Sequence, residues 1–104
     1  NRENFRSQAV VLHVFVVDWC PHCTRAKPEV AKLKNNLANN GNKVNNNSVR
    51  VNLVNAEENK ELARKHNVNA YPTCVLELPG GETIPFNNNV TANNLNEFLN
   101  SNVN

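Results

Sequence analysis

The stretch VVLHVFVVDWCPHC, residues 10–23, places a strongly apolar segment directly before a pair of cysteines. Its first eight residues are nearly all β-branched or aromatic, which is typical of a central strand covered on both faces. From about residue 20 to residue 37, apolar residues recur at spacings of three and four, so we expect a helix there. Cys20 and Cys23 are therefore predicted to lie in the first turn of a helix that follows a buried strand.

The rest of the chain alternates between strand and helix patterns. We expect strands at 49–54, 73–78 and 82–86, helices at 57–66 and 91–99, and a polar loop at 39–47. The Pro79-Gly80-Gly81 segment predicts a hairpin turn between the last two strands, and Thr91 is the expected N-cap of the final helix. Strands that alternate with helices pair in parallel, and the final hairpin adds an antiparallel edge. The sequence thus predicts one α/β domain over residues 1–104, a central mixed β-sheet flanked by helices on both faces.

The composition argues against several classes of function. The net charge of +2 is scattered over the 104 residues, without the clustered basic face that nucleic-acid-binding proteins carry. No apolar run approaches the roughly 20 residues needed to span a bilayer. Asparagine accounts for 24 residues, which we interpret as nucleotide bias tolerated on the surface and not as an aggregation-prone tract. Because the chain starts at Asn1 and not at a methionine, we expect a processed or trimmed form.

The spacing of Cys20 and Cys23 suits thiol–disulfide exchange. A helix start offers unpaired N–H groups and the positive end of the helix dipole, which lower the pKa of Cys20 and make it the nucleophile. Pro21 suits the first turn because its missing N–H is not needed there. His22 adds an imidazole near the Cys20 sulfur, with a positive charge when it is protonated. Since the thiolate exists only in the reduced protein, these effects make the disulfide more oxidising, by roughly 30 mV per pKa unit.

Other roles for the cysteines and histidines are less favoured. A structural zinc site normally takes two spaced pairs of ligands, and the candidates besides Cys20 and Cys23 lack that spacing, so we expect no metal and no cofactor. An inert structural disulfide is disfavoured because an exposed bridge at a helix start is a poor staple. The remaining residues are interpreted as follows: Cys74 as a buried apolar residue, with a regulatory thiol as the alternative, His13 as a hydrogen-bonded core residue, His22 as the residue that tunes Cys20, and His66 as a helix-end residue where positive charge is favourable.

Three features together resemble the thioredoxin superfamily: the Trp19-Cys20-Pro21-His22-Cys23 motif, Pro28 five residues later, and Tyr71-Pro72-Thr73 before a strand. The resemblance covers nearly the whole chain and implies the thioredoxin fold. It also implies a cis peptide bond before Pro72, facing the dithiol. The substrate-facing surface it implies consists of Trp19, Ala70, Tyr71 and Pro72. A Tyr71 that is merely packed remains the alternative for that residue.

The resemblance has limits that shape the expected function. The Pro-His dipeptide is similar to that of bacterial periplasmic disulfide-forming oxidases, but the 48 residues between Cys23 and Pro72 leave no room for their inserted helical domain. The length and the order of the expected elements resemble those of thioredoxin or of one catalytic domain of protein disulfide isomerase. Typical thioredoxins carry a buried carboxylate six residues before the first cysteine, where this chain has Val14. Deprotonation of Cys23 then falls to water, to substrate or to Asp18.

We therefore expect a protein thiol–disulfide oxidoreductase, tuned towards oxidase or isomerase activity. Its expected partners are cysteine-containing protein substrates and a redox partner (a reductase, an oxidase or glutathione), with no nucleic acid and no membrane span, and we expect a monomer. The alternatives are a glutaredoxin-like enzyme and a non-enzymatic peptide-binding module; glutaredoxins use a Gly-Gly pair to bind the glutathione backbone, whereas Gly80-Gly81 is expected here to form the hairpin turn. Without a targeting segment the cytoplasm or a virion is favoured, and an oxidising lumen would require a removed signal peptide.

Overall fold

The computed structural model describes residues 9–103, so the first eight residues and Asn104 of the predicted domain lie outside the described part. Every expected strand and helix is present, with ends that shift by a few residues, and one short strand is additional. The elements are, in order, β1 (Val10–Val16), α2 (Pro21–Asn39), β2 (Lys43–Val44), β3 (Asn47–Asn55), α3 (Lys60–Lys65), β4 (Thr73–Glu77), β5 (Thr83–Pro85) and α4 (Ala92–Asn102).

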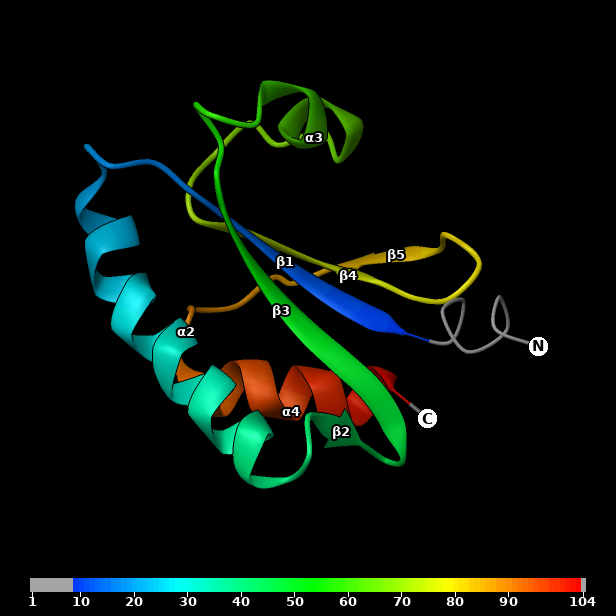
Figure 1. Ribbon diagram of the computed structural model, residues 1–104. Coiled ribbons are helices and arrows are strands. Elements are labelled where there is room, and N and C mark those ends of the chain that lie inside the picture. Colours follow the sequence, from blue (N-terminus) through cyan, green and yellow to red (C-terminus); the bar gives the residue numbers. More distant parts are fainter. Residues whose placement is uncertain (1–8, 104) are drawn as a thin grey trace.

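The five strands form one mixed sheet with β1 at its centre (Figure 1). The strand order is β2-β3-β1-β4-β5, with β1 parallel to β3 and every other pair antiparallel. Figure 1 shows α2 and α4 below the sheet and α3 above it, so helices cover both faces. This arrangement confirms the predicted thioredoxin fold, and its central strand is the apolar segment that precedes the cysteines.

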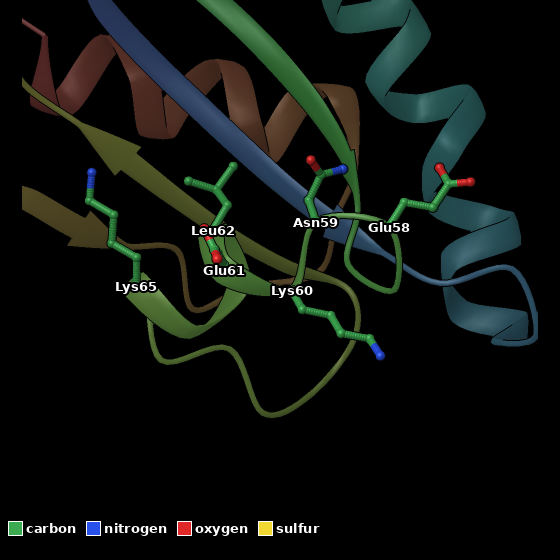
Figure 2. Close-up of a pocket in the computed structure, with 6 residues that line it drawn as sticks. All are labelled: Glu58, Asn59, Lys60, Glu61, Leu62 and Lys65. Carbon is green, nitrogen blue, oxygen red and sulfur yellow. The ribbon is translucent and has the colours of Figure 1, made fainter.

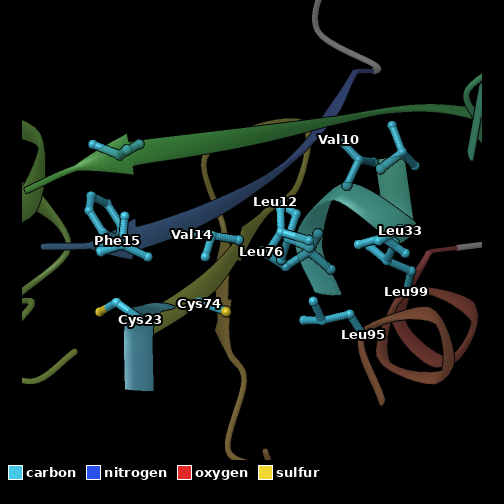
Figure 3. Close-up of a cluster of buried hydrophobic side chains, with 14 of the residues drawn as sticks. Val10, Leu12, Val14, Phe15, Cys23, Leu33, Cys74, Leu76, Leu95 and Leu99 are labelled. Atoms are coloured by element: carbon cyan, nitrogen blue, oxygen red, sulfur yellow. The ribbon is translucent and has the colours of Figure 1, made fainter. Parts of the chain in front are cut away.

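The main core lies between the sheet and the pair α2 and α4. Figure 3 shows Leu12 and Leu76 of the sheet beside Leu33 of α2 and Leu95 of α4, and all four side chains have no exposed area. Burying each such side chain contributes about 1.5–3 kcal/mol, so this layer stabilises the packing of α2 and α4 against the sheet. Within residues 9–103 no helix is both long enough and apolar enough to cross a membrane.

The two long helices begin as the sequence predicts. Pro21 occupies the first turn of α2, and the helix continues through Pro28 to Asn39. At the start of α4 the Thr91 side chain accepts a hydrogen bond from the Asn94 backbone N–H at 3.0 Å, which confirms Thr91 as the N-cap.

Strand β2 replaces part of the polar loop expected at 39–47. Lys43 pairs with Ser48 across a two-residue turn at Asn45 and Asn46, whose φ angles are 50° and 67°. Positive φ at both central residues is the signature of the turn that best joins two twisted antiparallel strands, and asparagine tolerates it better than most residues do. The expectation of an irregular loop is thus wrong at residues 43–44, where the asparagine run forms a hairpin.

Candidate active site

Cys20 stands at the N-cap of α2, immediately after the turn that ends β1. Its backbone is extended, at φ −97° and ψ 119°, and the helix has no side-chain cap at this end. Both cysteines of the motif are free thiols. Cys20 is 7% exposed, whereas Cys23 is completely buried one turn into the helix. A reacting partner can therefore reach only the Cys20 sulfur.

The surroundings of Cys20 favour its thiolate. The backbone N–H of Cys23 lowers the pKa of Cys20 most, and the Cys23 side chain, the N–H of His22 and the charge of Arg25 lower it further against the opposing effect of burial. These N–H groups belong to the first turn of α2, which has no intrahelical partner for them. The direction agrees with the sequence-based expectation for a cysteine at a helix start.

Cys23 behaves in the opposite way. Burial raises the pKa of Cys23, and the neighbouring Cys20 side chain adds to that effect, while the backbone N–H of Val17 and the Lys27 charge lower it in part. The pKa values of the two thiols are thus shifted in opposite directions, which favours the thiolate form of Cys20 and the thiol form of Cys23. Such a pair supplies a nucleophile and a protected second thiol at neutral pH.

The proton acceptor for Cys23 is not a buried carboxylate. Val14, at the position where a carboxylate would stand, is completely buried. Asp18 is exposed, and its carboxylate lies 3.5 Å from Lys27 Nζ and 3.5 Å from Asn55 Nδ2. Asp18 is thus paired with Lys27, whose charge also lowers the pKa of Cys23, and the three acceptors considered from the sequence, namely water, substrate and Asp18, remain.

The loop before β4 meets the dithiol as the resemblance implied. The Tyr71–Pro72 peptide bond is cis, and the Cys20 sulfur donates to the Tyr71 carbonyl oxygen at 3.7 Å. Trp19, which is 68% exposed, lies edge-on to Tyr71 with ring centroids 6.4 Å apart. Ala70 is exposed next to them, and its carbonyl accepts a hydrogen bond from Thr73 Oγ1 at 2.6 Å. Trp19 and Ala70 are exposed while Tyr71 and Pro72 are half-buried, and the four residues form one rim beside the Cys20 sulfur in which Tyr71 also packs against the core.

An arginine that sequence reasoning missed also reaches this site. Arg25 Nη2 lies 2.6 Å from His22 Nδ1. Because a guanidinium can only donate, Nδ1 accepts this hydrogen bond. The positive charge that acts on Cys20 therefore comes from Arg25, and His22 contributes its backbone N–H. The i,i+3 spacing of residues 22 and 25 on a helix was the only sequence signal for this contact.

Two surface hollows differ in their relation to the dithiol. An open groove of about 620 Å³ is lined by His22 and Arg25, by Pro72, and by Asn89 and Thr91, so it lies next to His22 of the motif and to the cis-proline. A second hollow of about 580 Å³ lies around α3 (Figure 2). Its charged side chains are of both signs and point in different directions. Only the first hollow is placed to hold a chain that reacts with Cys20.

Cys74 is separated from this chemistry by burial. It lies on β4 opposite Val14, is 2% exposed, and forms part of the cluster drawn in Figure 3. Burial raises the pKa of Cys74 to about 12. The geometry favours the interpretation of Cys74 as a small buried apolar residue over that of a regulatory thiol.

Comparisons with known proteins agree with this arrangement. The thioredoxin family model matches residues 2–101. A probable protein disulfide-isomerase A6 from Medicago sativa is 34% identical over 89 residues, which are 84% of this chain and 22% of that protein. The protein disulfide-isomerase of Oryctolagus cuniculus is 32% identical over 83 residues, 80% of this chain and 15% of that protein. The chain thus spans less than a quarter of the length of these curated relatives.

Solved structures show the same fold. The first thioredoxin domain of mouse protein disulfide-isomerase A4 superposes with a TM-score of 0.79 at 24% identity, covering 100% of this chain and 71% of that one. Mitochondrial thioredoxin 3 from Saccharomyces cerevisiae, in its oxidised form, superposes with a TM-score of 0.70 at 21% identity, covering 96% and 85%. At these identities the likeness concerns the fold.

Proposed function

This chain belongs to the thioredoxin family, and we propose that it exchanges disulfides with protein substrates through Cys20 and Cys23. The observation that carries the proposal is the opposite bias of the two thiols within one motif. The pKa of Cys20 is lowered at the accessible helix start, and the pKa of Cys23 is raised where the thiol is buried. Cys20 is accordingly the attacking thiol and Cys23 the resolving one.

The exchange takes two steps. The Cys20 thiolate attacks one sulfur of a substrate disulfide, so that a Cys20–substrate bond forms, the substrate bond breaks and one substrate thiolate leaves. Cys23 then loses its proton and attacks the Cys20 sulfur, which forms the Cys20–Cys23 disulfide and releases the second substrate thiolate. The first departing thiolate, water or Asp18 takes the Cys23 proton because Val14 offers no carboxylate. In the reverse direction, the same steps oxidise a substrate dithiol to a disulfide and reduce the Cys20–Cys23 disulfide.

The rim next to Cys20 is the proposed substrate surface. Trp19 offers an exposed aromatic face, Tyr71 offers a half-buried one, and the Pro72 loop brings backbone groups within reach of a bound extended chain. The groove lined by Pro72 and Asn89 gives such a chain a surface beside the cis-proline. These features support a polypeptide substrate more than a small thiol.

Oxidase or isomerase activity is the direction we propose for this dithiol. The N–H groups and Arg25 stabilise the Cys20 thiolate, which exists only in the reduced state, so they favour a more oxidising disulfide. The missing carboxylate at Val14 removes the group that would activate Cys23 for fast reduction of substrates. Equilibration of the Cys20–Cys23 pair with glutathione tests this direction, and a potential as low as about −270 mV, the value of a reducing thioredoxin, would contradict it.

The glutaredoxin-like alternative lacks support at its expected binding segment. Gly80 and Gly81 form the turn between β4 and β5, with the Gly81 N–H donating to the Leu78 carbonyl at 3.1 Å. The turn follows the end of β4, whereas Pro72 and Cys20 meet at its start. The two glycines therefore do not face the dithiol.

A refolding assay separates an enzyme from a non-enzymatic peptide-binding module. The protein is added to a scrambled disulfide substrate in a glutathione buffer, and regain of substrate activity is followed over time. We expect catalysis by the parent protein and by Cys74→Ala, and none by Cys20→Ser. Equal rates with Cys20→Ser would show that only peptide binding, and no exchange at Cys20, assists refolding.

A further inference from the structure

On the α3 side of the sheet, three side chains from three different elements converge away from the dithiol. His13 lies in the middle of β1, Glu77 ends β4, and His66 is the C-cap residue of α3. One potential ligand atom of each residue lies within 4.8 Å of those of the other two. His13 Nε2 is 2.8 Å from Glu77 Oε1, and the two imidazole rings are 4.9 Å apart between centroids. Nothing in the exchange chemistry at Cys20 uses these residues.

His66 is incompletely satisfied in this cluster. Over residues 9–103, its Nε2 is the one buried side-chain nitrogen or oxygen atom without a hydrogen-bond partner. Burial lowers the pKa of His66, and the charges of His13 and Lys65 lower it further against the opposing effect of Glu77. The position of His66 at a helix end predicts that a positive charge on its side chain would be favourable. Burial of the ring against His13 and Phe15 has the larger effect on its pKa.

Rotation of one side-chain amide would orient His13 as a metal-ligating histidine. Its second nitrogen, Nδ1, lies 3.3 Å from Asn52 Nδ2, which donates to it, on the strand paired with β1. The oxygen and nitrogen of an asparagine amide can exchange places by rotation, and the oxygen would then accept the Nδ1 proton. Metal-ligating histidines almost always donate their other ring N–H in this way, which directs Nε2 towards the metal.

The cluster adjoins an open cavity. This cavity of about 430 Å³ is lined by His66 and Glu77 together with residues of the β4–β5 hairpin. It provides an entry path and room for a water molecule as a further ligand. Lys65 also lines this cavity, and its charge opposes that of a cation while the Glu77 carboxylate favours it.

We propose that His13, His66 and Glu77 form a binding site for a divalent zinc-like cation, with a water molecule in the fourth position. Two imidazoles and one carboxylate are a donor set that Zn²⁺ accepts in tetrahedral geometry. The sequence alone predicts no metal because the candidate ligands are not spaced in pairs along the chain. The fold nevertheless brings together residues 13, 66 and 77, which are far apart in the sequence. A bound ion would join β1, α3 and β4, and its effect would be on stability, independent of the dithiol.

The test uses a Cys20→Ser/Cys23→Ser background, because thiolates also bind zinc. Isothermal titration with ZnCl₂ is expected to show one ion per chain, and Zn²⁺ is expected to raise the thermal unfolding midpoint. His66→Gln and Glu77→Gln, both at partly exposed positions, should each weaken binding by at least about tenfold and abolish the rise in midpoint. The tetrahedral ligand-field absorption of Co²⁺ in place of Zn²⁺ should appear in the background protein and be lost in both variants.

The matched control is His22→Gln in the same background, which removes an exposed imidazole outside the cluster and should leave zinc affinity unchanged. Circular dichroism confirms that each variant is folded before titration. Absence of binding, equal affinity in all variants, or loss of affinity in His22→Gln alone would each overturn the proposed site. None of these results affects the proposed function, because the assay protein lacks both reactive thiols.

Discussion

Two thiols three positions apart in the chain differ in accessibility and in charge preference, and the difference comes from their places in one helical turn. Cys20 receives backbone N–H groups at the N-cap, and Cys23 sits below them in the core. Arg25 adds the only cationic side chain among the causes that lower the pKa of Cys20 within the described part of the chain. At this scale the chemistry depends on single charges and single N–H groups.

Replacing Arg25 should weaken the Cys20 thiolate. Arg25→Gln removes a favourable charge, so the pKa of Cys20 should rise, and the reduction potential should fall by roughly 30 mV for each unit of that rise. Arg25→Lys keeps the charge and should retain most of the effect, and added salt should diminish the difference between variants because Arg25 is exposed. Thiolate absorbance against pH, beside glutathione equilibration, measures both quantities.

The same titration decides between the arginine and the histidine. His22→Ala leaves the Arg25 charge and the backbone N–H in place, so the pKa of Cys20 should change less than it does in Arg25→Gln. A larger rise in His22→Ala than in Arg25→Gln would restore the expectation that a protonated His22 provides the charge.

Cys74 should not react in the folded protein. With a pKa of about 12, only on the order of one Cys74 thiol in ten thousand is ionised at pH 8, and burial blocks access as well. Brief alkylation with iodoacetamide followed by peptide mass spectrometry should find Cys20 modified and Cys74 intact. After unfolding in urea, Cys74 should react like any other cysteine. Rapid labelling of Cys74 in the native state would revive the regulatory-thiol interpretation.

Among the elements, the β2–β3 hairpin shows how an asparagine-rich segment can be ordered. Asn45 and Asn46 take up left-handed backbone angles between two paired strands, and Val44 is buried in the core cluster. The polar composition of residues 39–47 suggested a loop because local hydrophobic periodicity is absent there. The turn chemistry of an Asn-Asn pair before a strand was the signal that would have identified the hairpin.

Substitutions at Asn46 test the turn. Asn46→Ala places a residue with a β-carbon and no local hydrogen-bonding group at φ 67°, so the free energy of unfolding should fall by about 1 kcal/mol. Asn46→Gly relieves the same restriction and should be neutral or stabilising. Urea denaturation of the two variants and the parent gives the comparison. An Asn46→Ala protein as stable as the parent would show that the turn does not depend on this conformation.

At the scale of the whole molecule, the fold joins residues that lie far apart in the chain. Glu29 of α2 accepts a hydrogen bond from the Ala92 backbone N–H at 2.9 Å and so satisfies the start of α4. That N–H, followed by the Lys32 side chain, lowers the pKa of Glu29. The two helices that cover the dithiol side of the sheet are thereby coupled through one carboxylate.

This coupling predicts a pH dependence of stability. Because the folded-state pKa of Glu29 lies below its ordinary value of 4.5, its stabilising contribution is fully present above that pH and is lost as pH falls through the folded-state value. Glu29→Gln should therefore be less stable than the parent at pH 7, and the difference should shrink on acidification. Glu97→Gln, an exposed substitution on α4, is the matched control and should show no such trend. A difference that is constant with pH would contradict the role of the Glu29 charge.

Local sequence patterns are sufficient to predict those elements of this fold whose conformation depends on neighbouring residues. The apolar run of residues 10–17, the helix start at Cys20 and the cap at Thr91 could each be predicted from neighbouring residues. Contacts between distant residues could not. The Glu29 contact with Ala92 and the convergence of His13, His66 and Glu77 depend on strand order and helix placement, which hydrophobic periodicity does not encode.

The central claim is that Cys20 attacks and Cys23 resolves, and trapping of a mixed disulfide tests it most directly. Cys23→Ser is incubated with a disulfide-containing protein substrate, and the covalent adduct is digested without reduction and mapped by mass spectrometry. We predict a stable adduct linked through Cys20, no adduct with Cys20→Ser, and release of the substrate when Cys23 is restored. An adduct that forms equally well with Cys20→Ser, linked through Cys23, would contradict the account.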